Sequence, residues 1–166
     1  MLILVLCFRY GFGDPSAEFW IGNDHLHFLT SQDNYQLQID MIDLYDRYTW
    51  ARYDVFTVAN EDAMYALELS GYQGNATDAL QYSNHMPFST VDRDNDVSST
   101  NCAKFYTAGW WYKHCHYANL NGRYTVGIVW FDHNEDQWSQ KKMTAMKIRP
   151  LKRQHSVSED TVVLDN

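Results

Sequence analysis

The chain is 166 residues long, 45% hydrophobic and 16% aromatic, which suits one folded domain with a sizeable core and excludes a disordered protein. The formal net charge of -8, without an extended basic run, excludes nucleic acid as a main partner, because phosphate binding needs a concentrated basic face. No segment reaches the ~20 consecutive apolar residues that a membrane-spanning helix needs.

The chain begins with the apolar run Met1–Phe8. Such a run resembles the core of a signal peptide, but a basic start and a small-residue cleavage site are both missing. We therefore expect residues 1–9 to be either a leader or a buried strand. The sequence Gly11–Pro15 that follows is typical of a turn.

Two short helices are expected next. Asp14 or Ser16 is a suitable cap for a first helix that continues through Phe19–Ile21. Gly22–Asp24 should end it, and His25–Thr30 looks like a second helical turn.

Strand patterns then appear in order. Polar and apolar residues alternate over Tyr35–Met41, which predicts a half-buried strand. Arg52–Val58 and Met64–Leu69 look like further strands, joined by the polar turn Ala59–Asp62. Consecutive strands with short connections favour an antiparallel sheet. The alternation returns in Met146–Arg149.

The middle of the chain lacks such periodicity. From Ser70 to about Asn134 it is rich in Gly, Asn, Asp, Ser and aromatic residues. A segment of this length without regular structure is uncommon in a compact domain unless it carries function or is held by cross-links or metal. Residues 151–166 are polar and without pattern, and we expect them to form a mobile tail.

Within this middle region, Asp92–Asp96 sets carboxylates at alternate positions of an irregular loop. Alternate aspartates can turn their oxygens inward on a hard cation such as Ca2+. The EF-hand pattern begins similarly but does not fit, because Val97 stands at the glycine position and Ala103 at that of the bidentate glutamate. A solvated acidic surface is the alternative interpretation.

Two cysteines, Cys102 and Cys115, flank a short stretch after this loop. A disulfide bond between them would indicate an oxidising compartment, and the glycosylation sequon Asn75–Thr77 agrees with that. The competing interpretation is a zinc site with His114 or His116, which is less favoured because the chain has no C-x-x-C pair.

Several short motifs occur in a set order along the chain. They are Tyr10–Gly13, Glu18–Asp24, Asp92–Asp96, Asn101–Ala103, Gly109–Tyr112, Cys115–His116, Asn119–Gly122 and Met146–Pro150. Together they closely resemble the fibrinogen C-terminal globular domain, which is found in ficolins, tachylectins, angiopoietins, tenascins and fibrinogen. The resemblance runs from about residue 10 to residue 150.

The resemblance implies an α+β fold, with an antiparallel sheet subdomain over about residues 10–70 and a loop-rich calcium-binding subdomain over about 71–150. The amino-terminal part of the family pattern, with its own disulfide and a strand of the sheet, has no counterpart here. Cys7 consequently has no predicted partner, and we expect a sheet edge to be exposed.

The resemblance also implies how Ca2+ is bound. The implied ligands are the side chains of Asp94 and Asp96 and the backbone carbonyls of Ser98 and Thr100, with water completing the shell. Asp92 would lie behind these ligands or at the surface. In the same pattern Cys102 pairs with Cys115.

Lectin-like members of the family hold an acetyl group beside the calcium loop. The matching positions are Tyr106 and His116, with the backbone N–H groups of Cys115 and His116 as donors to the acetyl oxygen. The resemblance also implies a cis peptide bond between His114 and Cys115. A structural histidine bonded to backbone is the alternative for His116.

One departure affects this site. The loop over residues 124–130 is shorter than in lectin-like members and lacks a tyrosine that helps to wall the acetyl pocket. Trp130, Phe131 or His133 could rebuild that wall. The specificity for acetyl groups is therefore left open.

We expect a secreted, calcium-stabilised recognition module that binds acetylated glycans in the manner of innate-immune lectins, with an oligomer possible. The alternative is a protein-interaction or matrix module of angiopoietin or tenascin type, for which Glu135, Asp136 and Trp138 could form the surface. An enzyme is not expected, because G-x-S-x-G, H-E-x-x-H and glycine-rich phosphate loops are missing from the sequence.

Overall fold

The computed structural model of this chain describes residues 3–124 and 127–151. The tail predicted over 151–166 therefore lies outside the described residues except for Leu151. The regular elements are α1 (Ile3–Tyr10), β1 (Phe12–Gly13), β2 (Phe19–Trp20), α2 (Asn23–Thr30), β3 (Tyr35–Asp43), β4 (Tyr48–Val58), η1 (Glu61–Ala63), β5 (Leu67–Gly74), η2 (Leu80–Ser83), α3 (Cys102–Tyr106), β6 (Ala118–Asn119), β7 (Val129–Asp132) and β8 (Gln137–Pro150).

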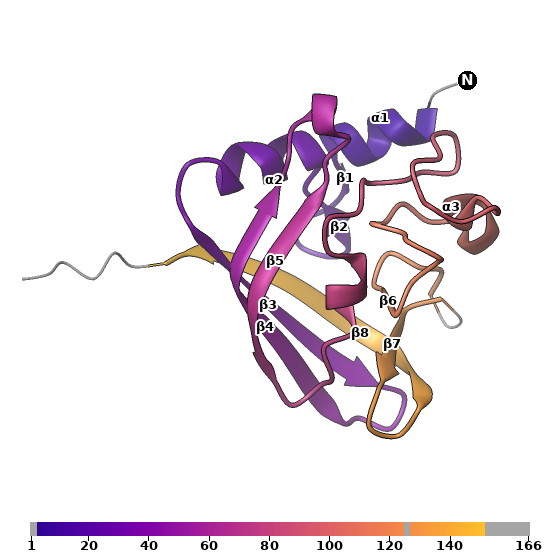
Figure 1. Cartoon of the computed structure of the whole chain (residues 1–166). Coiled ribbons are helices and arrows are strands. Elements are labelled where there is room, and N and C mark those ends of the chain that lie inside the picture. Colours follow the sequence, from indigo (N-terminus) through magenta and orange to yellow (C-terminus); the bar gives the residue numbers. More distant parts are fainter. Residues whose placement is uncertain (1–2, 125–126, 152–166) are drawn as a thin grey trace, which may run out of the picture.

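A 6-stranded antiparallel sheet organises this part of the chain, in the order β5-β4-β3-β8-β7-β6 (Figure 1). The last strand in the sequence, β8, lies inside the sheet and pairs with β3 from Tyr35↔Pro150 to Asp43↔Lys141. Helices α1 and α2 cross the upper end of the sheet, and the loops that carry α3 and β6 lie to its right in Figure 1. A mostly antiparallel sheet with a few helices confirms the predicted α+β class.

The core joins the sheet to the loop-rich region. The inward residues of β3, among them Leu37, Ile39 and Met41, are all 0% exposed. They belong to the same buried cluster as Trp110 and Trp111 of the loop region. The long segment without periodicity is therefore held in place largely by burial of its aromatic side chains, which contribute strongly because each removes a large apolar area from water.

The strand predicted within residues 1–9 is wrong, because Ile3–Tyr10 forms helix α1. A run that is apolar throughout has neither helical nor strand periodicity, so the sequence pattern alone cannot distinguish the two. The helix is anchored by Arg9, whose Nε donates to Asp24 at 2.9 Å and whose Nη1 donates to Glu61 at 2.7 Å.

The first short helix predicted from Asp14 onward is also wrong. Phe19–Trp20 forms β2, which pairs with β1, and the Asp14 carboxylate accepts the Ser16 N–H at 2.8 Å to close a turn. Gly11 makes this arrangement possible, since its φ is 95° and a Cβ there would lie 2.6 Å from the carbonyl oxygen of Ile21.

Strand β5 begins later than predicted. Met64 and Tyr65 have φ values of 53° and 54°, so the chain is still turning before Leu67. At this edge of the sheet the side-chain amide of Asn84 accepts the Leu69 N–H at 2.9 Å and donates to its carbonyl at 3.0 Å. Part of the edge is therefore covered, which limits its pairing with another chain.

Candidate functional site

A disulfide bond joins Cys102, the first residue of α3, to Cys115, with an S–S distance of 2.04 Å. It confirms the predicted pairing and makes the zinc alternative wrong, because both sulfur atoms are used. The side chain of Asn101 caps α3 by accepting the Lys104 N–H at 2.7 Å. Cys7 is not disulfide-bonded within the described part of the chain.

The acidic loop folds around the carboxylate of Asp96. Its Oδ1 accepts the Ser98 N–H at 2.8 Å and its Oδ2 accepts the Cys102 N–H at 2.9 Å. Burial raises the pKa of Asp96, and the neighbouring charge of Asp94 raises it further, while the two backbone hydrogen bonds oppose the shift. The two carboxylates thus lie close enough to repel each other.

Asp92 accepts hydrogen bonds from residues outside this pair. Its Oδ1 accepts the Thr90 hydroxyl at 2.7 Å and its Oδ2 accepts the Val5 N–H of α1 at 3.2 Å. Over residues 3–124 and 127–151 no three His, Cys, Asp or Glu side chains gather as a metal-binding group. A cation at this loop would therefore depend on Asp94 and Asp96 together with uncharged oxygens, a donor set that suits Ca2+ and does not suit Zn2+.

The segment that ends in the second cysteine lies against the acidic loop. The Lys113 carbonyl accepts the Val97 N–H at 3.3 Å, and the Lys113 N–H donates to the Cys115 carbonyl at 2.7 Å. The peptide bond between His114 and Cys115 is cis, as the sequence resemblance implies. The His114 carbonyl accepts the hydroxyl of Tyr82 at 3.2 Å.

An aromatic cluster of Tyr106, Tyr112, His116 and Trp138 lies beside this segment. The ring of His116 is 4.4 Å from that of Tyr106, 5.7 Å from that of Tyr112 and 5.4 Å from that of Trp138, measured between centroids. Burial lowers the pKa of His116 to about 4, so its imidazole is neutral at pH 7. His116 Nδ1 forms no hydrogen bond to any described residue, which does not support a purely structural histidine bonded to backbone.

The structure also shows where the three candidates for the missing wall lie. Trp130 is buried and its Nε1 donates to the Thr77 carbonyl at 2.8 Å. Phe131 and His133 pack on the ring of Tyr117, at 5.0 Å and 5.1 Å. Besides the predicted Tyr106, the rings that contact His116 are those of Tyr112 and Trp138. Neither of these two was assigned to the acetyl site from the sequence.

These features define a class of protein: a domain in which an antiparallel sheet carries a disulfide-braced region of aromatic loops. The model of the family described as the fibrinogen beta and gamma chains, C-terminal globular domain, matches residues 7–151. The chain belongs to this family. Domains of the family are recognition or interaction modules, so the chain is not an enzyme.

Relatives of known sequence agree with this assignment. The chain is 44% identical to the protein scabrous of Drosophila melanogaster over 144 residues, which covers 87% of this chain and 18% of that protein. It is also 44% identical to Tenascin-R of Rattus norvegicus over 148 residues, covering 86% of this chain and 11% of that protein. The chain thus spans only a small part of these relatives.

Solved structures share the fold. The fibrinogen-like globe domain of human ANGPTL6 superposes with a TM-score of 0.80 at 37% identity, covering 89% of this chain and 71% of that one. A lamprey fibrin D-dimer complexed with the peptide Gly-His-Arg-Pro-amide gives a TM-score of 0.79 at 30% identity, covering 96% and 61%. Among the described residues, no helix has the length and apolar character to cross a bilayer.

Proposed function

We propose that this chain is a calcium-stabilised recognition module that binds the acetyl group of an N-acetylated glycan beside His116. The observation that carries the proposal is the contact of Tyr106 with His116, at 4.4 Å between rings, next to the cis bond before Cys115. No described residue accepts a hydrogen bond from the backbone N–H of Cys115 or His116. These donors suit an acetyl oxygen, and the ring of Tyr106 suits the methyl group.

Calcium would act as a brace for this site. Asp94 and Asp96, with the carbonyls of Ser98 and Thr100, would hold the ion. Its charge would offset the burial and the repulsion by Asp94 that together raise the pKa of Asp96. Because the Lys113 carbonyl bonds to the same loop, loss of the ion should loosen the segment that carries His116. The ion itself would perform no chemistry.

The proposed compartment is extracellular. The disulfide bond between Cys102 and Cys115 supports it, since such bonds persist in oxidising environments. The sequon residue Asn75 is exposed, and its Oδ1 accepts the Trp50 N–H at 2.7 Å, which leaves its Nδ2 available for a glycan.

A titration of N-acetylglucosamine by calorimetry tests this proposal. We expect binding in calcium, weaker binding in EDTA, and a loss of about fivefold in affinity for His116→Ala, because ring contacts of this kind are worth about 1 kcal/mol. The matched control is His25→Ala on α2, an exposed histidine that should leave the affinity unchanged. Binding that is equal in calcium and EDTA, or unchanged in His116→Ala, would refute the proposal.

A protein ligand is the second candidate function. The lamprey fibrin D-dimer, a neighbour of the same fold, is complexed with a cationic peptide. Here Glu135 and Asp136 are exposed beside Trp138, whose side chain is 49% exposed, and this acidic and aromatic surface suits such a peptide. Gly-His-Arg-Pro-amide is titrated into the unaltered chain and into the double variant Glu135→Gln/Asp136→Asn. A protein-ligand function predicts weaker peptide binding in the variant, and the acetyl-binding function does not.

A further inference from the structure

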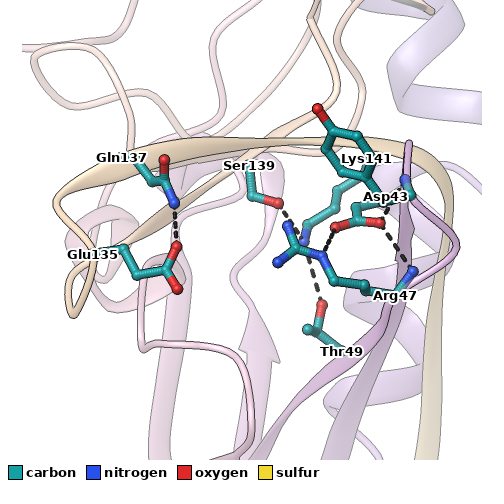
Figure 2. Close-up of polar contacts among 8 residues, drawn as sticks. Asp43, Arg47, Thr49, Glu135, Gln137, Ser139 and Lys141 are labelled. Atoms are coloured by element: carbon teal, nitrogen blue, oxygen red, sulfur yellow. Dashed lines mark hydrogen bonds and ion pairs between the residues drawn. The ribbon is translucent and has the colours of Figure 1, made fainter.

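A cavity of about 360 Å³ lies between the β3–β4 turn and the β7–β8 hairpin. Its volume falls within the range of small-molecule sites. Asp43, Thr49, Ser139 and Lys141 converge inside it, as Figure 2 shows, and Trp138 lines its wall. The glycosylation sequon Asn75–Thr77 lies at the wall of this cavity, but the sequence did not predict a binding site here.

Lys141 is the unusual residue of the cavity, because it is a lysine of which only 3% is exposed. Its Nζ donates to Ser139 Oγ at 2.9 Å and to Thr49 Oγ1 at 3.3 Å, and both acceptors are neutral. An ammonium group has three N–H donors, so one donor has no acceptor among the described residues. Burial lowers the pKa of Lys141, as expected for a charge whose lost hydration is not fully replaced.

Asp43, which pairs with Lys141 in the strand register, already accepts hydrogen bonds from other groups. Asp43 Oδ1 accepts the backbone N–H groups of Tyr45 and Arg47 at 2.8 Å and 2.9 Å, and its Oδ2 pairs with Arg47 Nε at 2.6 Å (Figure 2). Arg47 offsets much of the charge of Asp43, whose remaining field, with that of Asp132, still favours the charged form of Lys141. The third N–H of Lys141 nonetheless has no carboxylate within hydrogen-bonding distance among the described residues.

The acidic residues at the rim, Asp132 and Glu135, likewise accept hydrogen bonds from neutral N–H groups. Asp132 Oδ1 accepts the backbone N–H groups of Asn134 and Glu135 at 2.9 Å and 3.3 Å. Glu135 accepts a hydrogen bond from the side-chain amide of Gln137 (Figure 2). Neither carboxylate forms an ion pair with Lys141 within the part of the chain that the structure describes.

We propose that this cavity binds a hexuronic acid residue of a glycan, whose carboxylate accepts the third N–H of Lys141. A charge-assisted hydrogen bond of this kind is strongest where the surroundings exclude water. The half-exposed indole of Trp138 offers a flat apolar face to the C–H groups of a pyranose ring. Gln137 and Gln140 supply side-chain amide groups for the sugar hydroxyls.

An extended peptide fits this cavity less well. The strands around it, β3, β4, β7 and β8, are paired with one another or with β6, so they offer no free edge for backbone hydrogen bonds. The cavity shares only Trp138 with the aromatic cluster around His116. The inference therefore does not depend on the proposed acetyl site.

The test is a titration of glucuronate and of glucose, which differ only at the carbon that carries the carboxylate. We expect glucuronate to bind at least about tenfold more tightly than glucose, because one charge-assisted hydrogen bond is worth roughly that factor. Lys141→Met should lose this preference. The matched control Lys142→Met, which removes the adjacent lysine that pairs with Asp46 at 2.7 Å, should keep it. His116→Ala should keep it as well.

A second measurement needs no variant. Glucuronate, and not glucose, should slow the acetylation of Lys141 in the unaltered chain while Lys142 reacts at an unchanged rate, as followed by peptide mass spectrometry. Production of the chain in a bacterial host that does not attach N-glycans leaves Asn75, which lines the same cavity, unmodified. Three results would each overturn the inference. They are equal affinity for the two sugars, no protection of Lys141 from acetylation, and binding of a glutamate-containing peptide in place of glucuronate.

Discussion

His116 provides a quantitative test of the aromatic cluster through the pH dependence of stability. Its pKa in the folded chain is about 4, against a reference value of 6.5, because burial disfavours the imidazolium. Between these values the unfolded chain binds a proton that the folded chain does not. Above about pH 6.5 His116 therefore has no effect on the pH dependence of stability. As the pH falls from there toward about 4, the burial of its neutral imidazole progressively lowers the free energy of unfolding.

The shift corresponds to about 3 kcal/mol, at 1.36 kcal/mol per pKa unit. His116→Phe keeps an aromatic ring and removes the titration. Between pH 7 and pH 4 the free energy of unfolding of the unaltered chain should therefore fall by about 3 kcal/mol more than that of this variant. Urea denaturation measures this difference, and His25→Phe on the surface of α2 is the control. A His116 pKa near 6.5 by NMR, or parallel pH profiles for the two chains, would refute the reasoning.

Three further perturbations test the frame of the fold. Replacing Cys102 and Cys115 together by serine should lower the free energy of unfolding by about 2–4 kcal/mol in urea, and an unchanged midpoint would contradict the bracing role. Gly11→Ala should lower the free energy of unfolding by about 2 kcal/mol or more, because its Cβ would lie 2.6 Å from the Ile21 carbonyl oxygen. An unchanged melting temperature would contradict this. Asp43→Ala should cost about 2 kcal/mol, because its turn loses buried hydrogen bonds, and Asp43→Asn should recover part of the loss.

Calcium dependence is a separate prediction of the acidic loop. At a free Ca2+ concentration of 100 times Kd, binding should stabilise the chain by about 2.7 kcal/mol. Asp96→Asn keeps the shape of the side chain and removes its charge, so the increase in melting temperature on adding calcium should largely disappear. Asp62→Asn, at an exposed aspartate of η1, is the control and should keep it. A melting temperature that EDTA does not change in the unaltered chain would contradict the prediction.

The parts of the fold with a clear local pattern were predictable. The alternation over Tyr35–Met41 predicted β3, and His25–Thr30 lies within helix α2. The ordered motifs predicted the pairing of Cys102 with Cys115 and the cis bond before Cys115. These features depend on residues close in sequence or on a motif shared by a whole family.

Other parts depend on contacts that no local pattern contains. The run Met1–Phe8 is apolar throughout, so the sequence pattern alone does not decide that Ile3–Tyr10 forms a helix. The start of β8 at Gln137 was not predicted, since its first half is polar and is held by pairing with β3 and β7. The cavity around Lys141 combines three segments far apart in the sequence, and a single lysine between polar neighbours gives no signal by itself.

The central claim is that the backbone beside His116 receives an acetyl group, and amide NMR tests it most directly. On adding N-acetylglucosamine in calcium, the amide signals of Cys115 and His116 should shift first and most strongly, and glucosamine without its acetyl group should leave them in place. Shifts confined to Lys141 and its neighbours, or equal shifts with both sugars, would contradict the claim.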